Sequence, residues 1–175
     1  MTISRARITG AVYLLYFVTV IGAVALIGRT PAALSDAANL VANAIYIVVT
    51  LLLYQLFNRV SRNLAALAVV ISVVGCVIQS LSLFHLVPAQ SALPIFGLFN
   101  LTIGILILKS TFLPRGLGVL MALSGLGWLT FLSPDLVKHI SAYVQILGVA
   151  AEGSLMLWLL VKGVNVERWN AQARG

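Results

Sequence analysis

The sequence has very little charge: only 9% of its 175 residues are Asp, Glu, Lys or Arg, whereas 61% are hydrophobic. A soluble globular domain has about a quarter of its residues charged. The mean hydropathy of +1.09 excludes such a domain and predicts an integral membrane protein. Lys and Arg outnumber Asp and Glu by 11 to 4. The basic residues are spread over the ends of apolar runs, so we expect them to face a lipid bilayer and no nucleic acid.

Cysteine and catalytic motifs are also scarce. The one cysteine, Cys76, excludes an internal disulfide and any site that needs several cysteine ligands. The sequence contains no phosphate loop, HExxH motif, carboxylate pair or nucleophile beside a base, so we expect no enzyme, cofactor or metal. His85 and His139 leave a haem iron or a shared metal as an alternative, although no third ligand accompanies them.

Long apolar runs dominate the chain, and a helix needs about 20 such residues to cross a bilayer. Six runs qualify, at about residues 8–28, 38–58, 64–87, 93–109, 114–133 and 142–162, and a polar tail follows at 163–175. Pro114 predicts a helix start, because proline fits the first turn of a helix and breaks its interior. The predicted fold is therefore an all-α bundle of six transmembrane helices in one domain.

The basic residues orient this bundle. With the N-terminus inside, nine of them fall in cytoplasmic segments: Arg5, Arg7, Arg59, Arg62, Lys109, Arg115, Lys162, Arg168 and Arg174. Only Arg29 and Lys138 fall in outer segments. Because cytoplasmic loops are enriched in Lys and Arg, both termini are predicted to be cytoplasmic. A signal peptide ending near Ala25 is the alternative interpretation of the first run.

Glu152 is the only carboxylate inside a predicted span. A charge at the bilayer centre costs between about 3 and more than 10 kcal/mol, so Glu152 must be protonated, paired or in contact with water. It is therefore the main candidate for a functional residue.

Other polar residues share helix faces with one another, because positions three or four apart lie on one side of a helix. These stripes contain Ser141, Gln145, Gly148 and Glu152; Asn39, Asn43, Tyr46, Thr50 and Tyr54; Ser72, Gln79, Ser82 and His85; and Gly97, Asn100 and Gly104. We predict a polar cavity open to the outer face, with Glu152 at its floor and Gln79 or Asn100 as its nearest partner. The candidate site residues are Glu152, Gln79, Asn100, Gln145, Asn43 and His85. Simple hydrogen bonding between helices, worth about 0.6 kcal/mol per bond, is the alternative for the amides and serines.

We expect the small and aromatic residues to serve helix packing or to anchor the helices at the membrane interface. Gly118, Ala122 and Gly125 are spaced to let two helices approach closely, and we expect this within the bundle. Tyr13, Tyr16, Trp128 and Trp158 are interpreted as packing residues or interfacial anchors.

Several stretches resemble the domain-of-unknown-function 4386 family of bacterial membrane proteins. They are residues 7–15, 51–54 and 63–67, Lys109-Ser110 through Phe112-Leu113-Pro114-Arg115 with 117–120 and 125–127, and Glu152 followed by 157–166. The resemblance implies a polytopic bundle in a bacterial cytoplasmic membrane and no known activity. Similar proteins carry an arginine and an acidic or amide residue in the third span, where this chain has Ser72 and Gly75, and a longer stretch between the third and fourth spans.

Two functions remain open. The short, almost entirely apolar chain favours a non-catalytic accessory or structural subunit of a larger membrane complex or oligomer. The alternative is a small transporter or hydrophobic-ligand-binding protein that uses Glu152 and the outward-facing cavity. Because exposed tails usually fray, order in the polar tail would indicate contact with another chain.

Overall fold

The computed structural model describes residues 3–26, 32–88 and 90–172, and all the regular secondary structure within these ranges is helical. The elements are α1 (Ile3–Leu26), α2 (Ala32–Phe57), α3 (Arg62–Leu83), α4 (Leu93–Lys109), α5 (Arg115–Leu129), the 3-10 turn η1 (Thr130–Leu132), α6 (Pro134–Val161) and α7 (Val166–Gln172). The predicted all-helical bundle is therefore confirmed.

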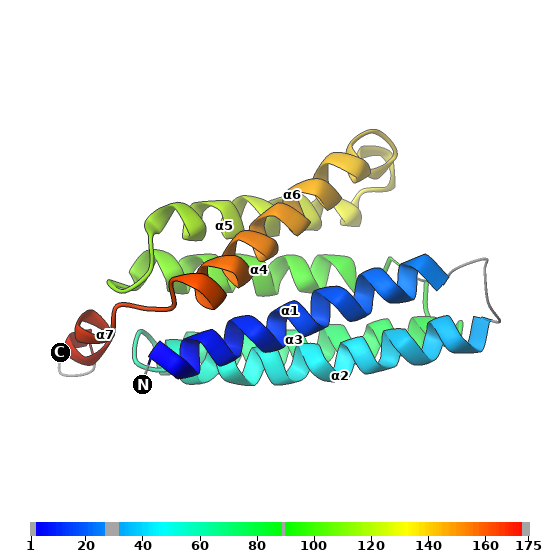
Figure 1. Cartoon of the computed structure of the whole chain (residues 1–175). Helices are drawn as coiled ribbons and strands as arrows, with labels where there is room; N and C mark the ends of the chain where they lie inside the picture. Colours follow the sequence, from blue (N-terminus) through cyan, green and yellow to red (C-terminus); the bar gives the residue numbers. More distant parts are fainter. Residues whose placement is uncertain (1–2, 27–31, 89, 173–175) are drawn as a thin grey trace.

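The first six helices form a ring. Each helix packs on the next one along the chain, and α6 closes the ring by packing on α1 (Figure 1). The described ends of the chain and α7 lie at one end of this bundle, together with the α2–α3 and α4–α5 connections. The core of the ring contains buried side chains from several helices, among them Tyr13, Leu53, Phe99, Ile103 and Leu155.

Five helices, and not the six predicted, are long enough and apolar enough to cross a membrane. α1, α2, α3, α5 with η1, and α6 are long and apolar enough to cross a membrane, whereas α4 has 17 residues. At 1.5 Å per residue α4 spans about 26 Å, short of the hydrocarbon thickness of about 30 Å. The outer faces are nevertheless apolar: Val18, Ile21 and Ile146 are 59%, 64% and 68% exposed. Such a surface suits lipid and not water.

Some helix boundaries differ from the predicted runs. α3 ends at Leu83 and leaves His85 in the following loop, where its φ of 57° lies in the left-handed region. α6 begins at Pro134, well before residue 142, because proline at the first turn lets the polar segment up to Ser141 join the helix. Pro114 caps the start of α5 as predicted. Arg29 and Arg174 lie outside the described residues.

Glycines allow α4 and α5 to cross at very short range. A Cβ atom added at Gly104 would lie 2.7 Å from the backbone nitrogen of Ala122, and one added at Gly125 would lie 2.6 Å from that of Leu101. Gly118 meets Leu108 in the same way. The expected close approach within the bundle is thus confirmed.

The polar tail folds back onto the bundle. Trp169 of α7 is 4% exposed, and its Nε1 donates a hydrogen bond of 3.0 Å to the carbonyl of Leu56. Gln172 donates to the carbonyl of Lys109 and accepts from the backbone N–H of Thr111, each at 3.0 Å. These contacts within the chain account for the order of α7, so that order does not indicate another chain.

Candidate functional site

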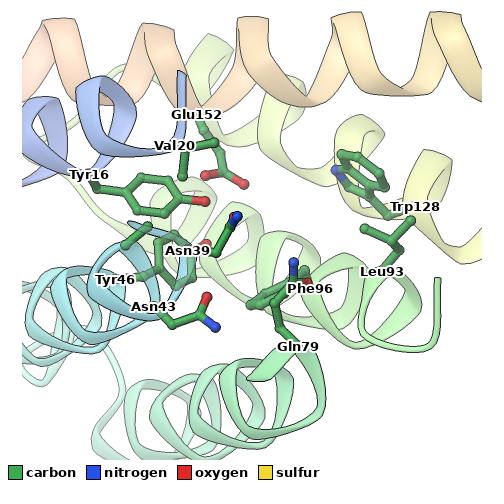
Figure 2. Close-up of a pocket in the computed structure, with 11 residues that line it drawn as sticks. Tyr16, Val20, Asn39, Asn43, Tyr46, Gln79, Leu93, Phe96, Trp128 and Glu152 are labelled. Atoms are coloured by element: carbon green, nitrogen blue, oxygen red, sulfur yellow. The ribbon is translucent and has the colours of Figure 1, made fainter. Parts of the chain in front are cut away.

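A cavity of about 180 Å³ lies inside the ring, and all six helices contribute to its wall (Figure 2). The lining residues are Tyr16 and Val20 of α1; Asn39, Ala42, Asn43 and Tyr46 of α2; Gln79 of α3; Leu93 and Phe96 of α4; Trp128 of α5; and Glu152 of α6. On α1, α3 and α5 they lie in the later half of the helix, and on α2 and α4 in the earlier half, except that Tyr46 lies just past the midpoint of α2. Glu152 also lies past the midpoint of its helix, α6, and forms the end of the cavity nearest to α7. The cavity therefore occupies the half of the bundle that is away from the N-terminus and α7.

Two neutral side chains hold the carboxyl group of Glu152. The hydroxyl of Tyr13 donates a 2.7 Å hydrogen bond to Oε2, and Nδ2 of Asn100 donates a 3.0 Å bond to Oε1. Tyr13 and Asn100 are both fully buried, whereas Glu152 is half-buried and points into the cavity (Figure 2). A carboxylate can accept about four hydrogen bonds, so this one keeps acceptor capacity on the cavity side.

No basic side chain neutralises Glu152 in the described part of the chain. The one ion pair found there joins Lys138 and Asp135, which are both exposed near the start of α6. A membrane-embedded carboxylate ordinarily pairs with a cation or with water. Glu152 thus presents an uncompensated acidic group to the cavity.

Asn100 connects Glu152 to α5. Its Nδ2 also donates to the hydroxyl of Ser124 at 3.3 Å, while its Oδ1 is buried and has no hydrogen-bond partner among the described residues. A half-turn of the amide would point Oδ1 at Glu152, and this orientation would suit a protonated carboxyl group, which can donate. The orientation of Asn100 is therefore tied to whether Glu152 carries a proton.

Aromatic rings form much of the remaining wall. The rings of Tyr16 and Tyr46 have centroids 4.6 Å apart, and Phe96 meets Tyr46 edge-on at 5.6 Å. Tyr13 packs behind them, 6.2 Å from Tyr46. Aromatic pairs in such tilted and edge-to-face arrangements fix one another's orientation. The cavity wall thus combines one acidic group with several aromatic rings.

Three other predicted site residues lie near Glu152: two of them line the cavity, and the third is hydrogen-bonded to the carboxyl group of Glu152. Asn100, which was predicted with Gln79 as the nearest partner of Glu152, bonds it at 3.0 Å, but the hydroxyl of Tyr13 is nearer, at 2.7 Å. Gln79 and Asn43 line the cavity but are not hydrogen-bonded to Glu152. Asn43 donates to the hydroxyl of Ser80 on α3 at 3.0 Å, which is the plain interhelical bonding that the alternative interpretation described.

Gln145 and His85 were also predicted as site residues, but the structure does not bring them to the cavity that Glu152 lines. Both side chains are exposed and neither lines the cavity. In this part of α6 the helix packs on α5, through Val144 against Gly127 and through Gly148 against the ring of Trp128, so Gln145 faces outward. His85 does not continue the predicted polar stripe of α3, because the helix ends at Leu83. No group of three His, Cys, Asp or Glu residues suited to a metal occurs in the described ranges.

Tyr13 is the functional candidate that the sequence interpretation missed. It was taken for a packing residue or an interfacial anchor, yet its hydroxyl bonds the only carboxylate inside a predicted span, across 139 residues of sequence. The available signal was its position three residues after Gly10, whose missing side chain lets α1 touch the backbone of α6 at Leu160.

Comparison with known proteins gives one match. No curated protein and no solved structure matches the chain. The domain of unknown function DUF4386 matches residues 89–163. The predicted resemblance is therefore confirmed over α4, α5 and α6, while the stretches at 7–15, 51–54 and 63–67 lie outside the match and stay predictions. The part of the chain that carries Asn100, Trp128 and Glu152 is thus similar to DUF4386, a domain of unknown function.

Proposed function

We propose that this protein binds a small organic cation in the cavity of its helix ring, with Glu152 as the counter-charge. The observation that carries the proposal is the environment of Glu152: neutral donors hold its carboxyl group at the cavity, and no described basic residue pairs with it. A cationic ligand would supply the missing charge and so make a carboxylate at this depth tolerable.

The cavity wall adds to the same preference. The rings of Tyr16, Tyr46, Phe96 and Trp128 line it, and a cation over such a ring gains about 0.5 to 2 kcal/mol. The side-chain amides of the neighbouring wall offer oxygens to the N–H groups of an amine. The cavity volume of about 180 Å³ is below the roughly 300–1,000 Å³ of sites for drug-sized ligands. It therefore favours a small alkylamine over a lipid or a large hydrophobic ligand.

The proposal includes six spans and a cytoplasmic location of both termini. α4 serves as the short sixth span, because eight of its residues are buried between its neighbours and little of it needs to face lipid. Eight described basic residues lie near the end with α7, and contacts such as Arg7 to the carbonyl of Val161 and Arg168 to that of Thr111 join the segments there. Of the described basic residues, only Lys138 lies near the other end. By the positive-inside rule the cavity then belongs to the outer half, in a bacterial inner membrane.

A role as an accessory subunit of a larger membrane complex is the second prediction, and no observation in the described structure favours it. Its distinguishing support was order in the tail, which contacts within the chain explain. A pull-down of the tagged chain in mild detergent that returns a fixed-stoichiometry complex would favour that role over ligand binding by the isolated protein.

Ligand-dependent stabilisation of the protein in nanodiscs tests the proposal. A ligand at 100 times its Kd stabilises the folded state by about 2.7 kcal/mol. We expect small alkylammonium ions to raise the unfolding temperature and the matching uncharged alcohols to have no effect. Glu152→Gln should abolish the shift, whereas Asp135→Asn, which removes an exposed carboxylate from the same helix, should retain it. An equal shift for Glu152→Gln and the unchanged protein would refute the assignment.

A further inference from the structure

A second pocket, separate from the cavity, lies at the end of the bundle that carries α7. It measures about 380 Å³ and is lined by Arg5 of α1, Gln55, Asn58 and Arg59 at the end of α2, and Trp169 of α7. The guanidinium of Arg59 lies 4.8 Å from the centroid of the Trp169 ring, which is itself anchored to the carbonyl of Leu56. One of the two arginines is thus held in place by stacking.

The charge of this pocket is unbalanced. Neither Arg5 nor Arg59 takes part in an ion pair in the described part of the chain. Glu167 is the only acidic residue of the sequence near this end, and it lies within 4.0 Å of no described cation. A planar guanidinium fits phosphate oxygens in a bidentate geometry. The pocket therefore favours an anion, and a phosphate group in particular.

Hydrogen-bonding capacity is also left over in the wall. Oδ1 of Asn58 is buried and has no partner among the described residues. The buried Oδ1 cannot be reached from the pocket, whereas Nδ2 of Asn58 makes no hydrogen bond among the described residues and can donate to a phosphate oxygen.

An apolar groove leaves the basic pocket and runs along α1 and α2. Its volume is about 210 Å³, and its lining residues are Arg5, Ile8, Thr9, Leu52 and Gln55. Arg5 and Gln55 belong to both pockets. Ile8 and Leu52 lie three residues further toward the middle of their helices, about one turn deeper, and the Thr9 hydroxyl is satisfied by the carbonyl of Arg5. The groove thus offers an apolar path directly beneath the two arginines.

We propose that the pocket and the groove together form a site for an anionic phospholipid. Its phosphate contacts Arg5, Arg59 and Nδ2 of Asn58, and the start of one acyl chain lies over Ile8 and Leu52. Basic pockets between helices at the cytoplasmic face recognise phospholipid headgroups in this way. The bound lipid would join α1, α2 and α7 at the point where the tail folds back. This site is independent of Glu152 and of the cation proposed for the cavity.

The test is a lipid titration of the full-length protein in mild detergent, followed by native mass spectrometry. Phosphatidylglycerol should bind saturably with one lipid per chain and more tightly than phosphatidylcholine. Each juxtamembrane basic residue contributes about 1 kcal/mol to such binding, so Arg5→Gln and Arg59→Gln should each weaken it about fivefold. Arg5 makes no side-chain hydrogen bond in the described structure, so Arg5→Gln is the variant least able to disturb the fold.

The control variants are Arg62→Gln and Arg115→Gln, which remove the same charge at the same end of the bundle but line neither pocket. They should bind phosphatidylglycerol like the unchanged protein. Equal losses in both pairs would overturn the site, because general attraction to the surface would then explain binding. Displacement of phosphatidylglycerol by an equal concentration of glycerol 3-phosphate would overturn the role of the acyl chain and leave a site for a soluble phosphate.

Discussion

Tyr13→Phe isolates the hydrogen bond that holds Glu152. The substitution removes one hydroxyl and leaves the ring, which is fully buried against Tyr16, Phe17 and Tyr46. Tyr16→Phe is the matched control, because Tyr16 lines the same cavity and donates no hydrogen bond among those found in the structure. The difference between the two variants reports the bond and not the aromatic packing.

The loss of stability expected for Tyr13→Phe depends on whether Glu152 acts as a charged acceptor or as an ordinary interhelical hydrogen-bond partner. A bond to a charged acceptor contributes about 1.5–3 kcal/mol, whereas hydrogen bonds between membrane helices average about 0.6 kcal/mol in double-mutant cycles. The Tyr13–Glu152 bond is short, at 2.7 Å, and its acceptor is the carboxyl group that we assign as a counter-charge. We therefore expect Tyr13→Phe to lower the free energy of unfolding by about 1.5–3 kcal/mol, and Tyr16→Phe to change it by less than about 0.5 kcal/mol.

The assay is reversible unfolding in bicelles for Tyr13→Phe, Glu152→Gln and the double variant. The coupling free energy of this cycle removes effects of each substitution alone. A coupling of about 0.6 kcal/mol or less would refute the reasoning, because Glu152 would then be one more interhelical hydrogen bond in a packed bundle.

Two further predictions concern the ring and the tail. Gly104→Ala should lower the free energy of unfolding by about 1–3 kcal/mol, because its Cβ atom meets the backbone of Ala122 at 2.7 Å and no rotamer change relieves the contact. The same unfolding assay on Gly116→Ala, where nothing lies within 4 Å of the added atom, should show no loss or a gain of up to about 1 kcal/mol. Trp169→Phe removes the donor to the carbonyl of Leu56, so hydrogen exchange of residues 166–172 should become faster, by a factor that corresponds to about 1–3 kcal/mol. Trp158→Phe is its control, and equal exchange in both variants would contradict the docking of α7.

The local features of the fold could be predicted from the sequence. The bounds of α4 agree with the predicted run at 93–109, and Pro114 marks the start of α5, because hydropathy and proline geometry act on consecutive residues. Glu152 stood out for the same reason, since one carboxylate in an apolar run is visible without any knowledge of its neighbours. Asn100 was named with Gln79 as a possible partner of Glu152 from helical spacing and predicted depth alone.

Two predicted site residues do not line the cavity. The rotation of α6 explains one of them, and the end of α3 explains the other. Gln145 shares a calculated stripe with Glu152, but close packing of α6 on α5 at Gly148 and Trp128 turns it outward. His85 continued the stripe of Gln79 only as long as α3 was assumed to extend past Leu83. Periodicity gives the faces of a helix but not which face meets a neighbour.

By itself the sequence determined that this protein is a helical membrane protein, where most of its helices lie and which carboxylate is anomalous. These properties follow from the hydrophobicity and backbone chemistry of neighbouring residues, which no distant contact can change. Only the tertiary structure decided that α6 closes on α1, that Tyr13 reaches Glu152 and that Trp169 returns to Leu56. Such pairings join residues more than a hundred positions apart, and they depend on which helices can approach closely enough for their side chains to meet.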